Sequence, residues 1–134
     1  NNGAVMVNYF GHGTTAGWTG SNILRSQDSA LLNNQRPVLM TLFTCLNGNF
    51  TELTNESIAE AMFKREQGGA FAVLASSAMN YADVQEQMNR ILYKALLNKA
   101  RLGDAARESK VTLGNLSHKR TWILLGDPTQ KVVR

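Results

Sequence analysis

The sequence predicts a layered α/β domain with a mainly parallel sheet. Four short apolar runs bounded by turn residues have the pattern of strands that are covered on both faces. Stretches with helical spacing lie between these runs, and such alternation is typical of strand–helix–strand units. The chain has 134 residues, which is enough for one domain at most.

Each predicted strand is a continuous apolar run next to Gly, Pro or polar turn residues. The second run follows Pro37, the third follows Gly68 and Gly69, and the fourth ends at Gly126. Gly and Pro interrupt regular structure, so they mark the ends of these strands. The predicted strands cover residues 4–10, 38–44, 70–75 and 121–125, with a short edge strand over 130–134.

The predicted helices follow from apolar residues spaced three and four apart. A short helix is expected over 26–32 and a second over 56–66, which Gly68 terminates. The most regular pattern predicts an amphipathic helix over 82–100. A last helix is expected over 105–111, with Asp104 as its N-cap.

The composition excludes several function classes. Cys45 is the single cysteine, so no disulfide can form within the chain. No stretch reaches the roughly 18 apolar residues of a membrane span. The net charge of +4 comes from basic residues in the second half, mostly over 90–110. Without an Arg-rich run or interleaved aromatic residues, this pattern is typical of a solvated helix face, and nucleic acid is not expected as a partner.

Two side chains that could take part in catalysis follow neighbouring predicted strands. His12 stands between Gly11 and Gly13 after the first run, and Cys45 follows the second. Carboxyl ends of parallel strands meet at one edge of a sheet, where ligands bind. A thiolate is a nucleophile, and an imidazole beside it can favour the thiolate or protonate a leaving group. Structural roles stay open, because a lone Cys is often a small buried hydrophobe and a His in a glycine turn is often a loop residue.

The same region does not predict a metal or phosphate site. Zinc needs three or four protein ligands, and His118 is the only other imidazole. The glycines at 11, 13 and 17 match neither the P-loop nor the dinucleotide-binding fingerprint. The pair His12 and Cys45 therefore carries the functional prediction.

Five stretches resemble the gingipain family of cysteine peptidases, which belongs to the caspase-like group. They are "VNYFGHG", "FTCLNGNF", "SIAEAMF", "GGAFAVLASSAMN" and "TWILLGDPTQKVV", in this order along nearly the whole chain. The resemblance implies a three-layer α/β/α caspase-like fold and a cysteine endopeptidase that acts through an acyl-enzyme. It implies that Cys45 is the nucleophile, that His12 is the general acid, and that the amides of Gly13 and Cys45 form the oxyanion hole. It places the substrate-binding wall at Phe10, Phe43, Thr44, Ser76, Ser77 and Met79, although core packing is an equal alternative for Phe10 and Phe43.

The resemblance also implies protein or peptide substrates, no metal or organic cofactor, and a location outside the cell or at its surface. Family members carry further strands before the His-Gly strand, together with an acidic residue that orients the histidine. We therefore expect residues 1–134 to be the C-terminal part of a peptidase domain. The alternative is a catalytically inactive, peptidase-like module for binding or assembly. A third alternative, a nucleic-acid-binding domain, would use the basic face over 90–110.

Overall fold

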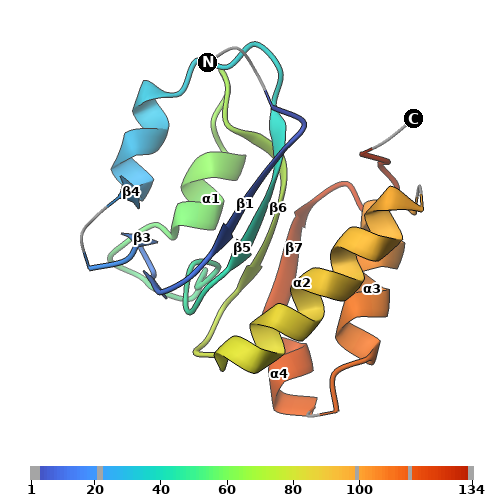
Figure 1. The fold of residues 1–134 in the computed structure, drawn as a ribbon. Coiled ribbons are helices and arrows are strands. Elements are labelled where there is room, and N and C mark those ends of the chain that lie inside the picture. The colour runs from blue at the N-terminus through green and yellow to red at the C-terminus, as the bar shows by residue number, and fades with distance from the viewer. Residues whose placement is uncertain (1–3, 21–22, 99, 115, 133–134) are drawn as a thin grey trace.

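A four-stranded sheet forms the centre of the chain, in the order β1-β5-β6-β7 (Figure 1). The computed structural model describes residues 4–20, 23–98, 100–114 and 116–132. The strands are β1 Met6–Phe10, β5 Val38–Phe43, β6 Ala70–Ser76 and β7 Trp122–Gly126, which confirms the four apolar runs as strands. Strands β1, β5 and β6 are parallel, whereas β7 pairs with β6 in the antiparallel direction. The sheet is thus mainly parallel, as expected.

Helices cover both faces of this sheet, so the predicted three layers are present (Figure 1). The 3₁₀ helix η1, Ser26–Leu31, and the helix α1, Ile58–Phe63, lie on one side. The helices α2, Ala82–Leu97, and α3, Leu102–Val111, lie on the other. The short helix α4, Leu116–Thr121, leads directly into β7. No helix in the described part of the chain is long and apolar enough to cross a membrane.

Strand β5 is buried along its whole length because it lies between two strands and two helical layers. Side chains alternate between the faces of a strand. Leu39 and Phe43 therefore join the cluster under α2 and α3, while Met40 and Leu42 join the cluster under α1. This double coverage explains why the run is apolar throughout instead of alternating.

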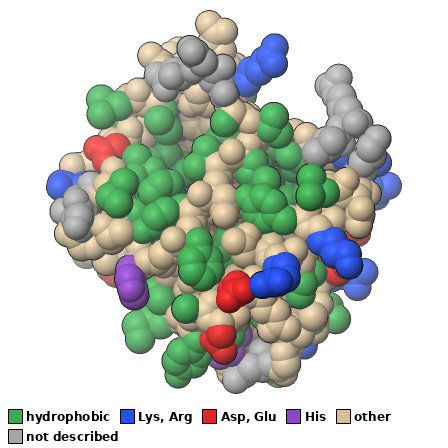
Figure 2. Space-filling view, in the orientation of Figure 1, with side chains coloured by type: hydrophobic (Ala, Val, Ile, Leu, Met, Phe, Trp, Pro, Cys, Tyr) green, Lys and Arg blue, Asp and Glu red, His purple; other side chains and the backbone are tan. Residues whose placement is uncertain are grey.

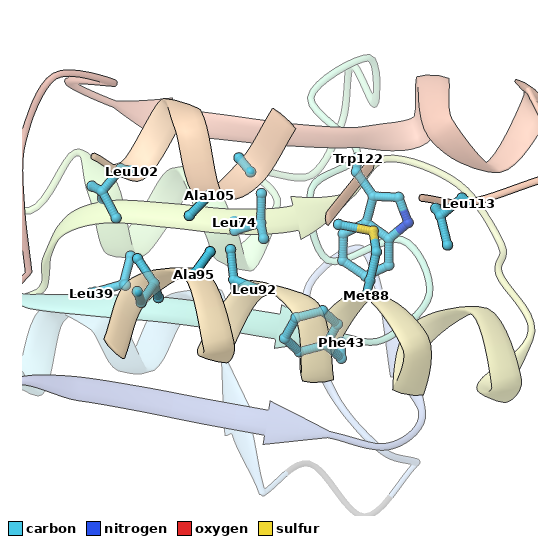
Figure 3. Close-up of a cluster of buried hydrophobic side chains, with 13 residues drawn as sticks. Leu39, Phe43, Leu74, Met88, Leu92, Ala95, Leu102, Ala105, Leu113 and Trp122 are labelled. Atoms are coloured by element: carbon cyan, nitrogen blue, oxygen red, sulfur yellow. The ribbon is translucent and has the colours of Figure 1, made fainter. Parts of the chain in front are cut away.

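The larger core lies between the sheet and the helices α2 and α3 (Figure 3). Phe43 and Trp122 meet there with ring centroids 5.3 Å apart, and Met88 of α2 lies beside them. All three side chains have 1% exposure or less. The carboxyl end of β5 is thus held by dense packing immediately before Cys45.

Helix α1 starts at a capping box. Ser57 Oγ accepts a hydrogen bond from Glu60 N at 3.3 Å, and the Glu60 carboxylate accepts from Ser57 N at 3.2 Å and from Ser57 Oγ at 2.8 Å. Burial raises the pKa of Glu60, but these bonds and the contact with Lys64 outweigh it, so the pKa lies below its ordinary value. The cap begins the helix at Ile58, two residues later than the sequence predicts.

Several local features differ from the sequence-based expectations. A second antiparallel sheet, formed by β2 Gly13–Thr14, β3 Gly17–Trp18 and β4 Leu24–Arg25, was not predicted, and neither was α4. Helix α3 begins three residues early with Arg101 as its N-cap, so Asp104 lies in the first turn and is not the cap. In place of the edge strand over 130–134, Lys131 forms an isolated bridge with Arg101, and residues 133–134 lie outside the described part.

The small sheet leaves a hollow beside β1. This hollow has a volume of about 430 Å³, and its apolar lining includes Val7, Trp18 and Leu24. Figure 2 shows that hydrophobic side chains gather on the face that carries β1. Trp18 stacks on Tyr9 with centroids 4.2 Å apart, so the small sheet is fixed to β1 just before the His12 turn.

Candidate active site

The register of β1 and β5 brings His12 and Cys45 to the same end of the sheet. The last paired residues of the two parallel strands are Phe10 and Phe43. The pairing extends one step further, since Gly11 N donates to Phe43 O at 3.2 Å. His12 and Cys45 each stand two residues beyond the last pair, so they occupy equivalent positions after adjacent strands. The structure thus places the two residues that the sequence singled out at the same end of adjacent strands.

The turn that carries His12 packs closely on the segment that carries Cys45. A Cβ atom on Gly13 would lie 2.7 Å from Thr44 Oγ1 and 2.7 Å from Asn47 Nδ2. Asn47 is fully buried and donates from Nδ2 to Thr14 O at 2.6 Å and to Gly17 O at 3.1 Å. Only glycine permits so close an approach of the backbone. Close packing against Thr44 and Asn47 therefore explains why a glycine follows His12.

A strained turn follows Cys45. Leu46 has a φ of 60°, in the left-handed region that a branched side chain adopts only at a cost of about 1–2 kcal/mol. Leu46 N donates to Ala78 O at 3.2 Å, and Leu46 O accepts from Asn49 N at 3.0 Å. Backbone strain of this kind persists where the surrounding contacts over-determine it, and it concentrates at functional sites. The turn ends the strand sharply and leaves Cys45 at its tip.

The Cys45 thiol and the His12 imidazole are both within reach of solvent. Cys45 is half-buried and His12 is exposed. Cys45 Sγ lies 3.4 Å from Asn80 N and 3.5 Å from Asn80 O. Among the described residues none forms a hydrogen bond with the His12 ring, whose backbone carbonyl accepts from Tyr9 Oη at 3.1 Å and from Thr19 N at 2.9 Å. The loop holding His12 is thus fixed by its backbone, while no described residue orients the ring through a hydrogen bond.

The backbone at the end of β5 offers a hydrogen-bond donor. Phe43 O is occupied by Gly11 N, whereas Cys45 N has no backbone acceptor among the described residues. An amide in this position can donate to a developing oxyanion. Helix α1 is attached to the same region, since Ala59 N donates to Asn47 O at 3.0 Å and Ile58 N donates to Thr15 O at 2.9 Å.

The six residues that the resemblance implies for substrate binding differ in exposure. The side chains of Phe43, Thr44 and Ser76 are fully buried, and Phe43 packs in the core, which was the alternative to a binding role (Figure 3). Phe10 is 44% exposed, Met79 is 75% exposed, and Ser77 has intermediate exposure. Phe10 is the last residue of β1 and Met79 follows β6, so these two side chains belong to the strands on either side of β5.

Ser77 has intermediate exposure, and its hydroxyl donates to Thr121 O at 2.9 Å. This contact joins the loop after β6 to the last residue of α4. Ser76 forms a second anchor of the loop, since its Oγ donates to Ala78 O at 2.9 Å. Both hydroxyls therefore satisfy loop backbone groups.

Three residues of the site were not predicted as functional. Asn47 joins the His12 turn to the Cys45 segment, Asn80 contacts the thiol through its backbone, and His118 Nδ1 lies 2.9 Å from Asn80 Oδ1. A loop asparagine has no distinguishing sequence pattern, and the only available signal is that both asparagines follow strand ends. The described residues contain no group of three or more His, Cys, Asp and Glu that could hold a metal ion.

Comparisons with known proteins relate the chain to two cysteine peptidases. Gingipain R2 and gingipain R1 of Porphyromonas gingivalis are each 28% identical to the chain over 146 residues, which cover 96% of the chain. The chain spans 20% of the first relative and 14% of the second. It therefore corresponds to a small part of each of these proteins.

Solved structures show the same fold. The crystal structure of the Arg-specific cysteine proteinase gingipain R is 26% identical and matches with a TM-score of 0.74, over 92% of this chain and 32% of that one. A structure described as a protease matches with a TM-score of 0.86 over 98% of this chain and 36% of its own, at 16% identity, and so supports the fold alone. The gingipain-type, caspase-like α/β fold is thus confirmed.

The family assignment rests on nearly the whole chain. The model of peptidase family C25 matches residues 1–133. This match includes the His12 turn, the Cys45 segment and the loop after β6. The chain belongs to peptidase family C25, a family of cysteine peptidases.

Proposed function

We propose that the protein is a cysteine endopeptidase in which Cys45 Sγ is the nucleophile and His12 is the proton donor. The observation that carries the proposal is the strand register, which gives both residues equivalent positions beyond the Phe10–Phe43 pair. Membership of a cysteine peptidase family supports protein or peptide substrates. On the basis of the gingipain resemblance, we also propose that the protein is located outside the cell or at its surface.

The proposed reaction has two steps. In the first, the Cys45 thiolate attacks the carbonyl carbon of the scissile peptide bond, and a tetrahedral oxyanion forms. The C–N bond then breaks, His12 gives a proton to the departing amine, and a thioester remains on Cys45. In the second, His12 takes a proton from a water molecule that attacks the thioester, the acid product leaves, and the thiolate returns. No metal or organic cofactor is needed for this chemistry.

The backbone supports the charge that develops in these steps. The proposed oxyanion donors are the amides of Cys45 and Gly13, and the first has no backbone acceptor among the described residues. Such donors are effective because they are already oriented when the charge appears. Phe10 and Met79, as exposed side chains on the neighbouring segments, are the proposed contacts for substrate side chains beside Cys45. Thr44, Ser76 and Ser77 are proposed to shape this region through the backbone.

The test uses the full-length protein that contains this chain and a mixture of fluorogenic peptides. Cys45→Ala and His12→Ala should each lose more than about 100-fold in kcat, because each removes a group that takes part in bond making or breaking. The melting temperature of each variant should stay near that of the wild type, since neither residue is in the core. Cleavage by Cys45→Ala at the wild-type rate would overturn the mechanism.

A catalytically inactive binding module is the second candidate. The specific observation behind it is that the His12 ring has no hydrogen-bond partner among the described residues, so nothing in this part of the chain fixes its orientation. Such a module would bind peptides without cleaving them, and its affinity would not change in Cys45→Ala. Binding measured by fluorescence polarisation beside the cleavage assay separates the two candidates.

A further inference from the structure

Asn80 joins the Cys45 thiol to the second histidine of the chain. Its backbone N and O lie 3.4 Å and 3.5 Å from Cys45 Sγ, and its side-chain Oδ1 lies 2.9 Å from His118 Nδ1. The thiol therefore contacts both the amide nitrogen and the carbonyl oxygen of one residue in the loop after β6. This contact is separate from the His12 turn, which comes from β1.

The Asn80 side chain is fully engaged in hydrogen bonds. Its Nδ2 donates to Ser76 Oγ at 2.6 Å and to Thr121 Oγ1 at 3.1 Å. An amide carries two N–H donors on nitrogen and acceptors only on oxygen. Since both donors are used, Oδ1 must be the acceptor toward His118, and His118 Nδ1 carries the hydrogen. The network thus fixes both the amide orientation and the imidazole tautomer.

His118 is itself held in place from two directions. Its backbone O accepts from Thr121 Oγ1 at 3.0 Å, and Thr121 Oγ1 in turn accepts from Asn80 Nδ2. The Tyr81 ring meets the imidazole edge-on, with centroids 5.5 Å apart. Asn80, Thr121 and His118 therefore form a closed ring of hydrogen bonds between the loop after β6 and helix α4.

We propose that this ring positions the nucleophile: Asn80 holds Cys45 Sγ through its backbone, and His118 is a positioning residue that acts through Asn80. The proposal rests on the proposed role of Cys45. The Asn80 N–H donates to sulfur and the Asn80 carbonyl accepts the hydrogen of the thiol, so the two backbone groups together fix the direction of Sγ. Without the His118 donor, Asn80 Oδ1 loses its partner, the loop loosens, and the backbone contact with Sγ is lost.

The test compares three variants of the full-length protein. His118→Ala removes the donor. His118→Asn is the conservative variant, because its Nδ2 can replace the imidazole Nδ1 as a donor. Thr112→Val is the matched control, since it removes one hydroxyl-to-backbone hydrogen bond of 2.9 Å at the end of α3 and takes no part in the ring. The two readouts are kcat and KM for peptide cleavage and the rate constant of Cys45 alkylation by iodoacetamide.

His118→Ala should lower kcat about tenfold with little change in KM, because small displacements of a reacting group cost rate without weakening binding. Alkylation should slow at least about threefold, because Sγ is no longer held in one direction by the Asn80 backbone. His118→Asn should return both values to within about twofold of the wild type, and Thr112→Val should leave both unchanged. If His118→Ala does not fold, Thr121→Val opens the same ring at its hydroxyl and should slow alkylation in the same way.

The proposal would be overturned if His118→Ala had the same kcat and the same alkylation rate constant as the wild type. It would also be overturned if His118→Asn were as impaired as His118→Ala, or if Thr112→Val were equally impaired, because the effect would then not depend on the donor. The alkylation readout does not require peptide cleavage. A wild-type protein that cleaves nothing would contradict the proposed function, while the dependence of alkylation on His118 would still decide this inference.

Discussion

Gly13→Ala is the sharpest test of how the two loops of the site fit together. The added Cβ would lie 2.7 Å from Thr44 Oγ1, 2.7 Å from Asn47 Nδ2 and 2.8 Å from Thr44 Cβ. Ordinary contacts are about 0.7 Å longer or more, and both neighbours are fully buried, so neither can swing into solvent. Overpacking of this kind costs about 1–3 kcal/mol in the free energy of unfolding.

The same substitution should also reduce activity. Thr44 is bonded directly to Cys45, so a shift of Thr44 by about 0.7 Å moves the nucleophile relative to His12. Misplacement on the scale of 1 Å can cost about 100-fold in rate, and we expect Gly13→Ala to lose roughly 10- to 100-fold in kcat. Gly20→Ala is the matched control, because a Cβ there meets no atom of the described residues within 4 Å.

Urea unfolding and peptide cleavage of the full-length protein measure the two effects. The reasoning would be refuted if Gly13→Ala matched Gly20→Ala in both the free energy of unfolding and kcat. That result would mean that the turn and the Cys45 segment are not in contact, and that the glycine after His12 has no steric role.

Three further predictions concern stability and are measured by urea unfolding. Ser57→Ala should cost about 0.5–2 kcal/mol, because it removes the cap of α1. The pKa of Glu60 is lowered in the folded state, so its contribution to stability is present above the ordinary value of 4.5 and is lost as the pH falls through the folded value. The difference in the free energy of unfolding between the wild type and Glu60→Gln should therefore shrink below pH 4.5. A difference that stays constant with pH would contradict this. Trp122→Ala should cost about 3–5 kcal/mol, since it empties the core beside Phe43, and a cost under about 1 kcal/mol would contradict the packing.

The central strands could be predicted because burial on both faces leaves a continuous apolar run. Leu39 and Phe43 face one helical layer, whereas Met40 and Leu42 face the other. Both faces of β5 are therefore apolar, and Thr41 is the one polar residue in this part of the strand. The direction of β7 could not be predicted. An apolar run such as Trp122–Gly126 has the same composition in either direction, and only the path of the preceding helix decides it.

The smaller elements had no sequence signal. Strands β2 to β4 have two residues each, which is too short for an alternating pattern, and the six residues of α4 include none that is fully buried. The helix N-cap was misplaced because Asp104 has the preferred residue type, whereas the chain turns at Arg101 instead. Local propensity was therefore overruled by tertiary contacts, including Leu102 N donating to Gln130 O at 2.9 Å.

The candidate site could be predicted only in part. His12 and Cys45 follow neighbouring apolar runs, and this is visible in the sequence. Asn80 and His118 lie 35 and 73 positions beyond Cys45, and only the fold brings Asn80 to the thiol and His118 to Asn80. The burial of Phe43 also depends on a distant partner, Trp122, so its core role could not be separated from a binding role.

The central claim is that Cys45 carries the acyl group of the substrate. The most direct measurement reacts the full-length protein with an activated peptide ester and locates the acyl group by mass spectrometry after rapid acid quenching. The account predicts an added acyl mass on the peptide that contains Cys45, and no such adduct in Cys45→Ala. Ester turnover that persists in Cys45→Ala, or an acyl group found on another residue, would contradict it.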